Sequence, residues 1–224
     1  MPAVLFDLDG TVADSIELIL SSARHAFIGF AGQAPSDEDW RRSIGRPLLS
    51  VLQEYAGGDE DEAQRLLARY RTFQLEHHDR LLRPYPGLLE VLEQLKASGY
   101  ELGIVTSKSD WLAERALDHL GMRSLFSVLV GCDTCVNHKP HPEPVERALA
   151  LMGADAAQAV YVGDSPHDMR SGRAANVRTL GVTWGAFGRE ELVAGGAQLV
   201  IDTVPELRAA VMQLMPMSPR VQTF

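Results

Sequence analysis

The spacing of apolar residues divides the chain into three stretches. Residues 3–7 form a short apolar run that ends at an Asp-Gly turn signal, which predicts a buried strand. From about residue 15 to residue 82, apolar residues recur every three to four positions, which predicts helices throughout. After residue 83, short apolar runs alternate with helical patterns.

The expected elements follow from this spacing. In the helical stretch we expect helices near residues 15–30, just after Ser36, and near 48–55 and 59–81. Later strands are expected near residues 100–106, 127–130, 159–163, 178–182 and 198–201, each followed by a helix, the last of them near 205–215. Such alternation predicts right-handed βαβ units and a parallel sheet that is covered on both faces.

The fold class is therefore expected to be α/β, a doubly wound, Rossmann-like parallel sheet core with an inserted all-helical cap domain. The core domain would comprise residues 1–14 and 83–215, because the first strand belongs to the same sheet as the later ones. The cap domain would comprise residues 15–82. Residues 216–224 are polar and contain proline, and we expect a loosely ordered tail.

Charge and hydropathy narrow the possible partners. The 30 acidic and 21 basic residues give a formal charge of −9, which argues against nucleic acid or an anionic membrane surface as a partner. No apolar run reaches the length needed to span a bilayer, and the N-terminus does not resemble a signal peptide, so we expect a cytoplasmic protein. The pattern leaves open whether the protein is a monomer or a dimer.

Polar side chains gather where the predicted strands end. In an open parallel sheet these positions meet at one edge. The residues in question are Asp7, Asp9, Gly10, Thr106, Ser107, Lys139, Asp164 and Asp168. Several carboxylates in one crevice would repel one another, and a bound cation removes that repulsion. Oxygen ligands without His or Cys suit a hard ion, so we expect Mg²⁺, and with the hydroxyls and the lysine they indicate a phosphate site.

The first strand end carries two carboxylates with different possible tasks. Asp7 and Asp9 lie two residues apart, a spacing that places both side chains on one face of an extended chain. One carboxylate could attack phosphorus, and the other could protonate the leaving oxygen and then activate water. Gly10 would let the chain turn sharply beside the ligand.

Four short segments resemble motifs of the haloacid dehalogenase superfamily, in its phosphoglycolate phosphatase-like branch. They are residues 7–12 (Asp-Leu-Asp-Gly-Thr-Val), Thr106-Ser107, Lys139-Pro140 and residues 163–168 (Gly-Asp-Ser-Pro-His-Asp), in the order of the family. The resemblance implies that Asp7 is the nucleophile and that Asp9 is the general acid/base.

The resemblance also implies roles for the other residues. Thr106 or Ser107 would bind phosphate, and Lys139 would balance its charge. Asp7, Asp164 and the Asp9 backbone carbonyl would hold the metal, with Asp168 as an orienting or water-mediated partner. The helical insertion would be the cap that closes over the site and excludes water.

The expected activity is therefore Mg²⁺-dependent hydrolysis of a small phosphorylated metabolite, such as phosphoglycolate, through an aspartyl phosphate. Pyrophosphate hydrolysis and phosphosugar transfer by the same fold stay open. Dehalogenation is less favoured, because that reaction needs no second aspartate in the place of Asp9. A function of a different class, an inactive protein-binding scaffold, is disfavoured by the intact set of carboxylates.

Two further features each allow two interpretations. Arg46, in a break within the cap, could meet an anionic part of the substrate or could be merely exposed. Cys132 and Cys135, with His138 and His141, have a spacing reminiscent of zinc sites, but an incidental pair of thiols is favoured because this segment leads into Lys139. Lys108 is expected to be a solvated residue.

Overall fold

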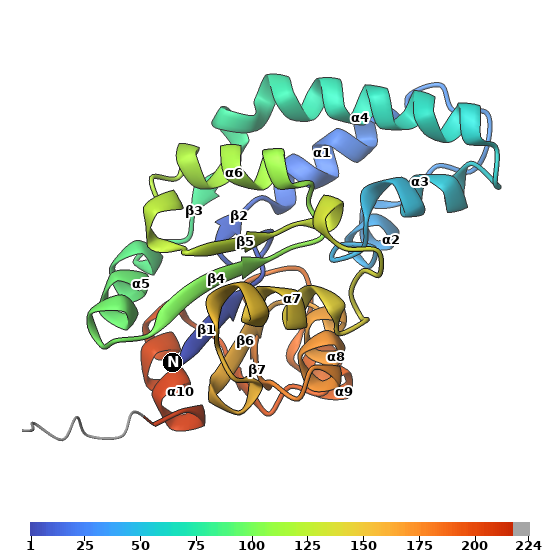
Figure 1. Ribbon diagram of the computed structural model, residues 1–224. Coiled ribbons are helices and arrows are strands. Elements are labelled where there is room, and N and C mark those ends of the chain that lie inside the picture. Colours follow the sequence, from blue (N-terminus) through green and yellow to red (C-terminus); the bar gives the residue numbers. More distant parts are fainter. Residues whose placement is uncertain (217–224) are drawn as a thin grey trace, which may run out of the picture.

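The computed structural model describes residues 1–216, which form a sheet flanked by helices and a helical layer above it (Figure 1). The main sheet has six parallel strands in the order β5-β4-β1-β6-β7-β8. Their bounds are β1 Ala3–Phe6, β4 Glu101–Val105, β5 Val128–Val130, β6 Ala159–Gly163, β7 Arg178–Val182 and β8 Leu199–Ile201. The expected doubly wound α/β class is confirmed.

The helices also lie close to their expected positions. Those of the insertion are α1 Ile16–Ala26, α2 Asp37–Arg41, α3 Leu48–Tyr55 and α4 Glu60–Leu81. Those around the sheet are α5 Leu88–Ala97, α6 Asp110–His119, α7 Glu143–Met152, α8 Pro166–Ala174, α9 Arg189–Gly195 and α10 Leu207–Leu214. The expected last helix begins later than predicted, because residues 204–206 form a 3₁₀ turn before α10.

The central strand β1 explains why both faces of the sheet are covered. Its side chains alternate between the two faces. Val4 and Phe6 join an apolar cluster that includes residues of α5, α6 and α10, whereas Ala3 and Leu5 join a second cluster that includes residues of α7. Since every residue of β1 is buried, its sequence is a continuous apolar run rather than an alternating one.

The four inserted helices have an apolar core of their own. Trp40 packs against Phe27, Tyr55 and Tyr70 within a cluster drawn from α1 to α4. Ser36 is the N-cap of α2, as the sequence predicted, and it forms a capping box with Asp39. Where the chain enters and leaves this helical layer, two short strands, β2 (Ala13–Asp14) and β3 (Arg83–Pro84), pair antiparallel; the sequence pattern did not predict them.

None of the helices within residues 1–216 is both long and apolar enough to cross a bilayer. The predicted tail comprises residues 216–224. All of these except Pro216 lie outside the described residues.

Candidate active site

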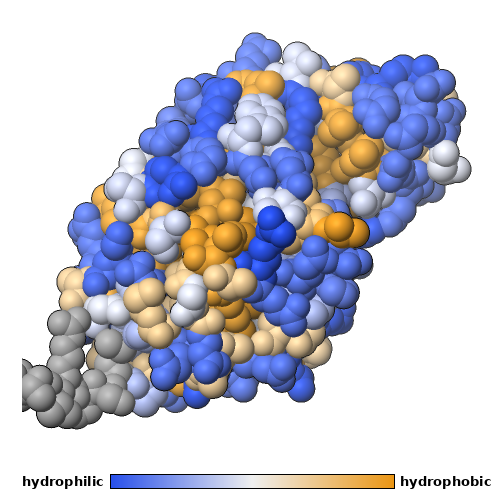
Figure 2. All heavy atoms as spheres, viewed as in Figure 1, coloured by the Kyte–Doolittle hydropathy of each residue, from blue (hydrophilic) through white to orange (hydrophobic). Residues whose placement is uncertain are grey.

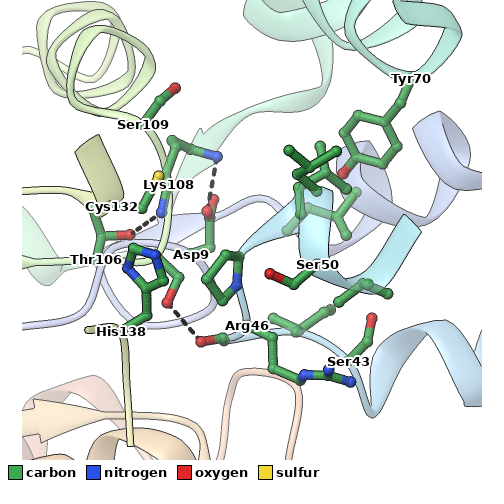
Figure 3. Close-up of a pocket in the computed structure, with 18 of the residues that line it drawn as sticks. Asp9, Ser43, Arg46, Ser50, Tyr70, Thr106, Lys108, Ser109, Cys132 and His138 are labelled. Carbon is green, nitrogen blue, oxygen red and sulfur yellow. Dashed lines mark hydrogen bonds and ion pairs between the residues drawn. The ribbon is translucent and has the colours of Figure 1, made fainter. Parts of the chain in front are cut away.

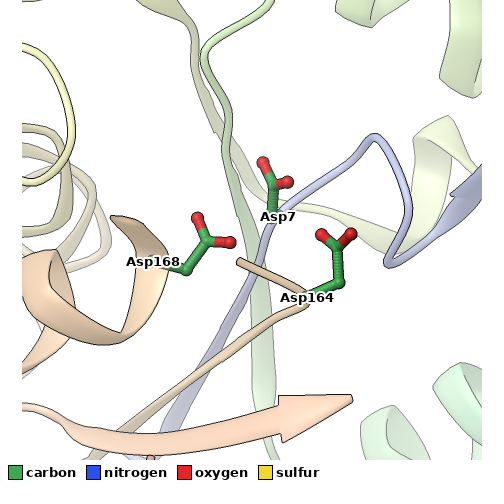
Figure 4. Close-up of side chains that lie close together, drawn as sticks. All are labelled: Asp7, Asp164 and Asp168. Atoms are coloured by element: carbon green, nitrogen blue, oxygen red, sulfur yellow. The ribbon is translucent and has the colours of Figure 1, made fainter. Parts of the chain in front are cut away.

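Three carboxylates converge at the carboxyl edge of the sheet. Asp7 directly follows β1, and its backbone N–H donates to the Val162 carbonyl of β6 at 2.9 Å, so the chain is still held to the sheet at this point. Asp164 directly follows β6, and Asp168 lies in the first turn of α8. One carboxylate oxygen from each of Asp7, Asp164 and Asp168 lies within 4.8 Å of the others, and the three carboxylates gather in one place (Figure 4).

A buried lysine joins two of these carboxylates. Lys139 Nζ lies 2.8 Å from Asp7 Oδ1 and 2.6 Å from Asp168 Oδ1. It also donates to the Tyr161 hydroxyl at 3.2 Å. Burial alone would lower the Lys139 pKa, but Asp168 and Asp7 outweigh it and raise that pKa. Lys139 is therefore a fully charged counterion inside the protein.

One lysine does not neutralise the whole cluster. Burial raises the pKa of Asp7 to about 7, even though Lys139 acts in the opposite direction. Burial, together with the charges of Asp7 and Asp168, also raises the pKa of Asp164 well above its usual range. The ionised form of this cluster is thus costly unless more positive charge is present.

This donor set fits a hard divalent cation. Asp7, Asp164 and Asp168 offer oxygen ligands only, and the raised pKa values of Asp7 and Asp164 mark a deficit of positive charge. Asp164 is held in place by the Thr11 hydroxyl, at 3.1 Å from Oδ1, and by the Ala186 N–H, at 2.7 Å from Oδ2.

Gly10 is required beside this cluster by space and by conformation. Its φ is +80°, and a Cβ at this position would lie 2.2 Å from Asp164 Oδ2. A side chain here would displace a carboxylate of the cluster, so Gly10 lets the backbone approach Asp164 closely.

Asp168 is oriented by its own helix. Its Oδ2 accepts hydrogen bonds from the Ser165 N–H at 3.1 Å and from the Ser165 hydroxyl at 2.6 Å, which completes a capping box at the start of α8. The other oxygen, Oδ1, accepts from Lys139 and lies 2.9 Å from the Tyr161 hydroxyl. Both oxygens are therefore fixed by protein groups, as an orienting role requires.

Asp9 stands apart from the three clustered carboxylates. Its Oδ2 lies 2.7 Å from Lys108 Nζ, and the Lys108 side chain is only 7% exposed, so the expectation of a solvated Lys108 is wrong. Burial opposes ionisation of Asp9, but the attraction of Lys108 outweighs it and lowers the Asp9 pKa. Asp9 Oδ1 is buried and has no hydrogen-bond partner among the described residues. The part of Asp9 expected to bind the metal is its backbone carbonyl, which stays a prediction.

The hydroxyls expected to bind phosphate lie at the mouth of the site. The Thr106 hydroxyl accepts from the Lys108 N–H at 3.2 Å, whereas the Ser107 hydroxyl donates to the Gly45 carbonyl of the insertion at 2.6 Å. Gly45 itself, with φ +94°, lies so close to Ser165 that a Cβ would meet its Oγ at 2.9 Å. The inserted helices are thus seated directly on the carboxyl edge of the sheet.

A cavity of about 370 Å³ separates the two parts of the protein at this place. Asp9 and Lys108 line it from the sheet, and Ser43, Ser50 and Tyr70 line it from the insertion (Figure 3). Asp7 also lines this cavity. Arg46 also lines the cavity, but its guanidinium already pairs with both oxygens of Glu54. The charge of Arg46 is therefore engaged within the insertion itself.

The thiols do not belong to a metal cluster in the part of the chain that the structure describes. Cys132 and Cys135 are free, and the single grouping of potential ligands found in residues 1–216 is the aspartate trio. Cys132 lines the cavity, where burial raises its thiol pKa to about 11 and keeps it protonated.

The sequence pattern did not indicate Tyr161, because this residue lies inside a buried apolar strand. Thr11 and Lys108 stand at predicted strand ends, but their contacts with Asp164 and Asp9 were not predicted. A period-two count along β6 would have placed Tyr161 on the same face as Leu5 but could not have indicated its contact with Lys139.

The parallel sheet, its helical insertion and the carboxylates around a buried lysine together define a hydrolase of the phosphatase type. Residues 4–182 match the family model of the haloacid dehalogenase-like hydrolases, and the chain belongs to that family.

Two relatives with similar sequences are named pyrophosphatase. Pyrophosphatase PpaX of Bacillus pumilus is 38% identical over 208 residues, which cover 93% of this chain and 95% of that protein. Pyrophosphatase PpaX of Bacillus cereus is 36% identical over 204 residues, covering 91% and 93%.

Two solved structures share the fold along almost the whole chain. A predicted phosphatase from Clostridium acetobutylicum is 28% identical, with a TM-score of 0.84 and coverage of 95% of this chain and 98% of that one. A predicted phosphoglycolate phosphatase from Haemophilus somnus is 25% identical, with a TM-score of 0.82 and coverage of 94% and 97%. The expected resemblance and the expected phosphatase class are confirmed.

Proposed function

We propose that the chain is a Mg²⁺-dependent phosphatase of small phosphorylated metabolites, with Asp7 as the nucleophile. One observation carries this proposal. The Asp7 carboxylate lies buried beside Lys139 and the other clustered aspartates, at the floor of a cavity that Asp9 also lines. The proposed nucleophile and the proposed acid/base group thus line one cavity, and the counterion lies buried beside the nucleophile.

The proposed reaction has two halves. An Asp7 oxygen attacks phosphorus, the bond to the leaving oxygen breaks, and Asp9 protonates that oxygen. Asp9 then takes a proton from water as the water attacks the aspartyl phosphate, which releases phosphate and restores Asp7. Lys108 holds the Asp9 pKa low in this structure. We propose that the phosphate of the substrate draws Lys108 away from Asp9, which would let Asp9 gain the proton that it gives to the leaving oxygen.

The metal and phosphate roles follow from the donor set. Asp7, Asp164, Asp168 and the Asp9 carbonyl would hold Mg²⁺, which when bound would offset the charge of the phosphoryl oxygens. Lys139 keeps Asp7 and Asp168 in place. Gly10, Thr106 and Ser107 would contact the phosphoryl group, and Ser107 would exchange its bond to Gly45 for one to phosphate.

Two substrates are proposed. Phosphoglycolate is one candidate, supported by the resemblance of the motifs to the phosphoglycolate phosphatase-like branch. Pyrophosphate is a second candidate, and it is favoured by the relatives named pyrophosphatase, which are more than 35% identical over more than nine-tenths of the chain. We also propose that the protein is cytoplasmic and that it binds neither nucleic acid nor membrane.

A phosphate-release assay tests the proposal. The purified protein should hydrolyse 4-nitrophenyl phosphate with Mg²⁺, and activity should vanish with excess chelator and return when Mg²⁺ is restored. Phosphoglycolate, pyrophosphate, a hexose phosphate and a nucleoside monophosphate would be compared under the same conditions. Turnover that is insensitive to chelator would contradict the metal role, and no release from any of these substrates would contradict the function.

Replacing Asp9 by Asn should lower kcat on the order of 10²- to 10⁴-fold, because Asn can neither give nor take the proton. The loss should be larger for phosphoglycolate than for 4-nitrophenyl phosphate, whose leaving group needs little protonation. Steady-state kinetics with both substrates measure this difference. An equal loss for the two leaving groups would contradict the acid role of Asp9.

A further inference from the structure

Among the Arg and Lys side chains that line the cavity, one pairs with no carboxylate of residues 1–216. Three Arg and Lys side chains line it besides the buried Lys139 below: Arg46, Arg71 and Lys108. Lys108 pairs with Asp9, and Arg46 pairs with Glu54. Arg71, on α4, pairs with no carboxylate of residues 1–216.

The Arg71 side chain is also partly shielded from solvent. It is half-buried, and the hydrogen bond it donates is to the neutral Gln74 side chain, Nη1 to Oε1 at 2.7 Å. Burial lowers the Arg71 pKa, although nearby acidic groups such as Asp9 act against this. A guanidinium that has lost water without gaining an anion is left with an uncompensated cost.

The surroundings of Arg71 suit an anion. Apolar residues of the insertion, Ile44, Pro47 and Leu48, form part of the same cavity wall and cannot solvate a charge. Over the α3 and α4 part of the insertion, apolar atoms gather within a mostly hydrophilic face (Figure 2). In such surroundings an ion pair is stronger than in open water.

We propose that Arg71 binds a second anionic group, carried by the leaving part of the substrate. The enzyme would then select small phosphates whose leaving part is itself a carboxylate or a phosphate, and would discriminate against neutral esters. This inference rests on the proposed function, since it assumes that the phosphoryl group sits beside Asp7. Both phosphoglycolate and pyrophosphate belong to the selected class.

The geometry assigns this task to Arg71 rather than to Arg46. The sequence indicated Arg46 as the cation of the insertion that could meet an anionic part of the substrate. That role of Arg46 in substrate binding stays a prediction. Its two terminal nitrogens are engaged by Glu54, so an incoming anion would have to displace a carboxylate. At Arg71 an incoming anion would displace only an amide oxygen.

The test compares acidic and neutral substrates in Arg71→Met. Phosphoglycolate and pyrophosphate are the acidic probes, and 2-hydroxyethyl phosphate and 4-nitrophenyl phosphate are the neutral ones. We expect KM for the acidic pair to rise on the order of 10- to 100-fold, as for loss of a charged hydrogen bond. KM for the neutral pair should change less than about threefold, and Arg71→Lys should recover part of the loss.

Two further variants separate the possible causes. Arg69 lies on the same helix, and its side chain donates to the His25 carbonyl away from the cavity; Arg69→Met should leave all four substrates unaffected. Arg46→Met should raise KM for the acidic pair less than Arg71→Met does.

Specific outcomes would overturn the inference. Equal losses for acidic and neutral substrates in Arg71→Met would show a structural role, and the same selective loss in Arg46→Met but not in Arg71→Met would assign the task to Arg46. If the unaltered protein hydrolyses none of the four substrates, the proposed function fails as well, and an active enzyme that is indifferent to Arg71 removes this inference alone.

Discussion

Replacing Asp7 by Asn should abolish turnover while leaving the protein folded. The amide cannot form the aspartyl phosphate, so kcat should fall on the order of 10⁴-fold or more, as when other enzymes lose a nucleophile. Asn has nearly the same shape as Asp and leaves no cavity. The measurement is phosphate release under the Mg²⁺ conditions that support the unaltered enzyme.

The fold of this variant should be at least as stable as that of the unaltered protein. Burial raises the pKa of Asp7 to about 7, which means that its charge is costly in the folded state, and Asn removes that charge from beside Asp164 and Asp168. Thermal unfolding without metal should therefore show an unchanged or higher Tm.

Asp14→Asn provides a matched control for this exchange. Asp14 is exposed at the base of the insertion, and the substitution should change neither kcat nor Tm appreciably. If Asp7→Asn kept kcat within tenfold of the unaltered enzyme, another group would have to be the nucleophile.

Replacing Lys139 by Met should destabilise the protein by about 3–5 kcal/mol, the usual cost of removing one partner from a buried ion pair. Met fills a similar volume but leaves Asp7 and Asp168 without their shared counterion. The hydrogen bond to Tyr161 is lost as well. Urea denaturation at a pH above 8 measures the free energy of unfolding, because the pKa of Asp7 in the folded protein is raised to about 7 and its carboxylate must be ionised for the loss of the counterion to be felt.

Activity should fall at least about 100-fold in the same variant, because the nucleophile is no longer held in position. Lys96→Met is the control, since Lys96 is exposed and donates only to the Ser124 carbonyl; its free energy of unfolding should shift by less than about 0.5 kcal/mol. A Lys139→Met protein as stable as the Lys96→Met protein would show that Lys139 is not the counterion that holds this cluster together.

Much of the fold could be predicted because its signals are local. The run Ala3–Phe6 is apolar at every position, as expected of a strand that is buried on both faces. The helical periodicity of residues 59–81 predicted the helix that the structure shows as α4. The missed pair β2 and β3 has two residues in each strand, too few for any periodicity to register. Their pairing arises from the meeting of two chain segments almost 70 residues apart.

The candidate site was predictable for a related reason. Parallel strands end at a common edge, so Asp7 and Asp164 could be expected to meet although 157 residues separate them. Lys139 was placed there by its resemblance to a family motif, not by any local pattern. The structure brings these three residues together with Asp168 in one buried cluster.

The sequence by itself determined the succession of strands and helices and the chemistry at the strand ends, because both follow from neighbouring residues along the chain. Only the tertiary structure decided how the charges pair: Lys108 with Asp9, Arg46 with Glu54, and Arg71 with no carboxylate among the described residues. Long basic side chains can reach many partners, and the choice depends on how the helical insertion packs on the sheet. No local pattern encodes that packing, since it sums many weak contacts between segments distant in the chain.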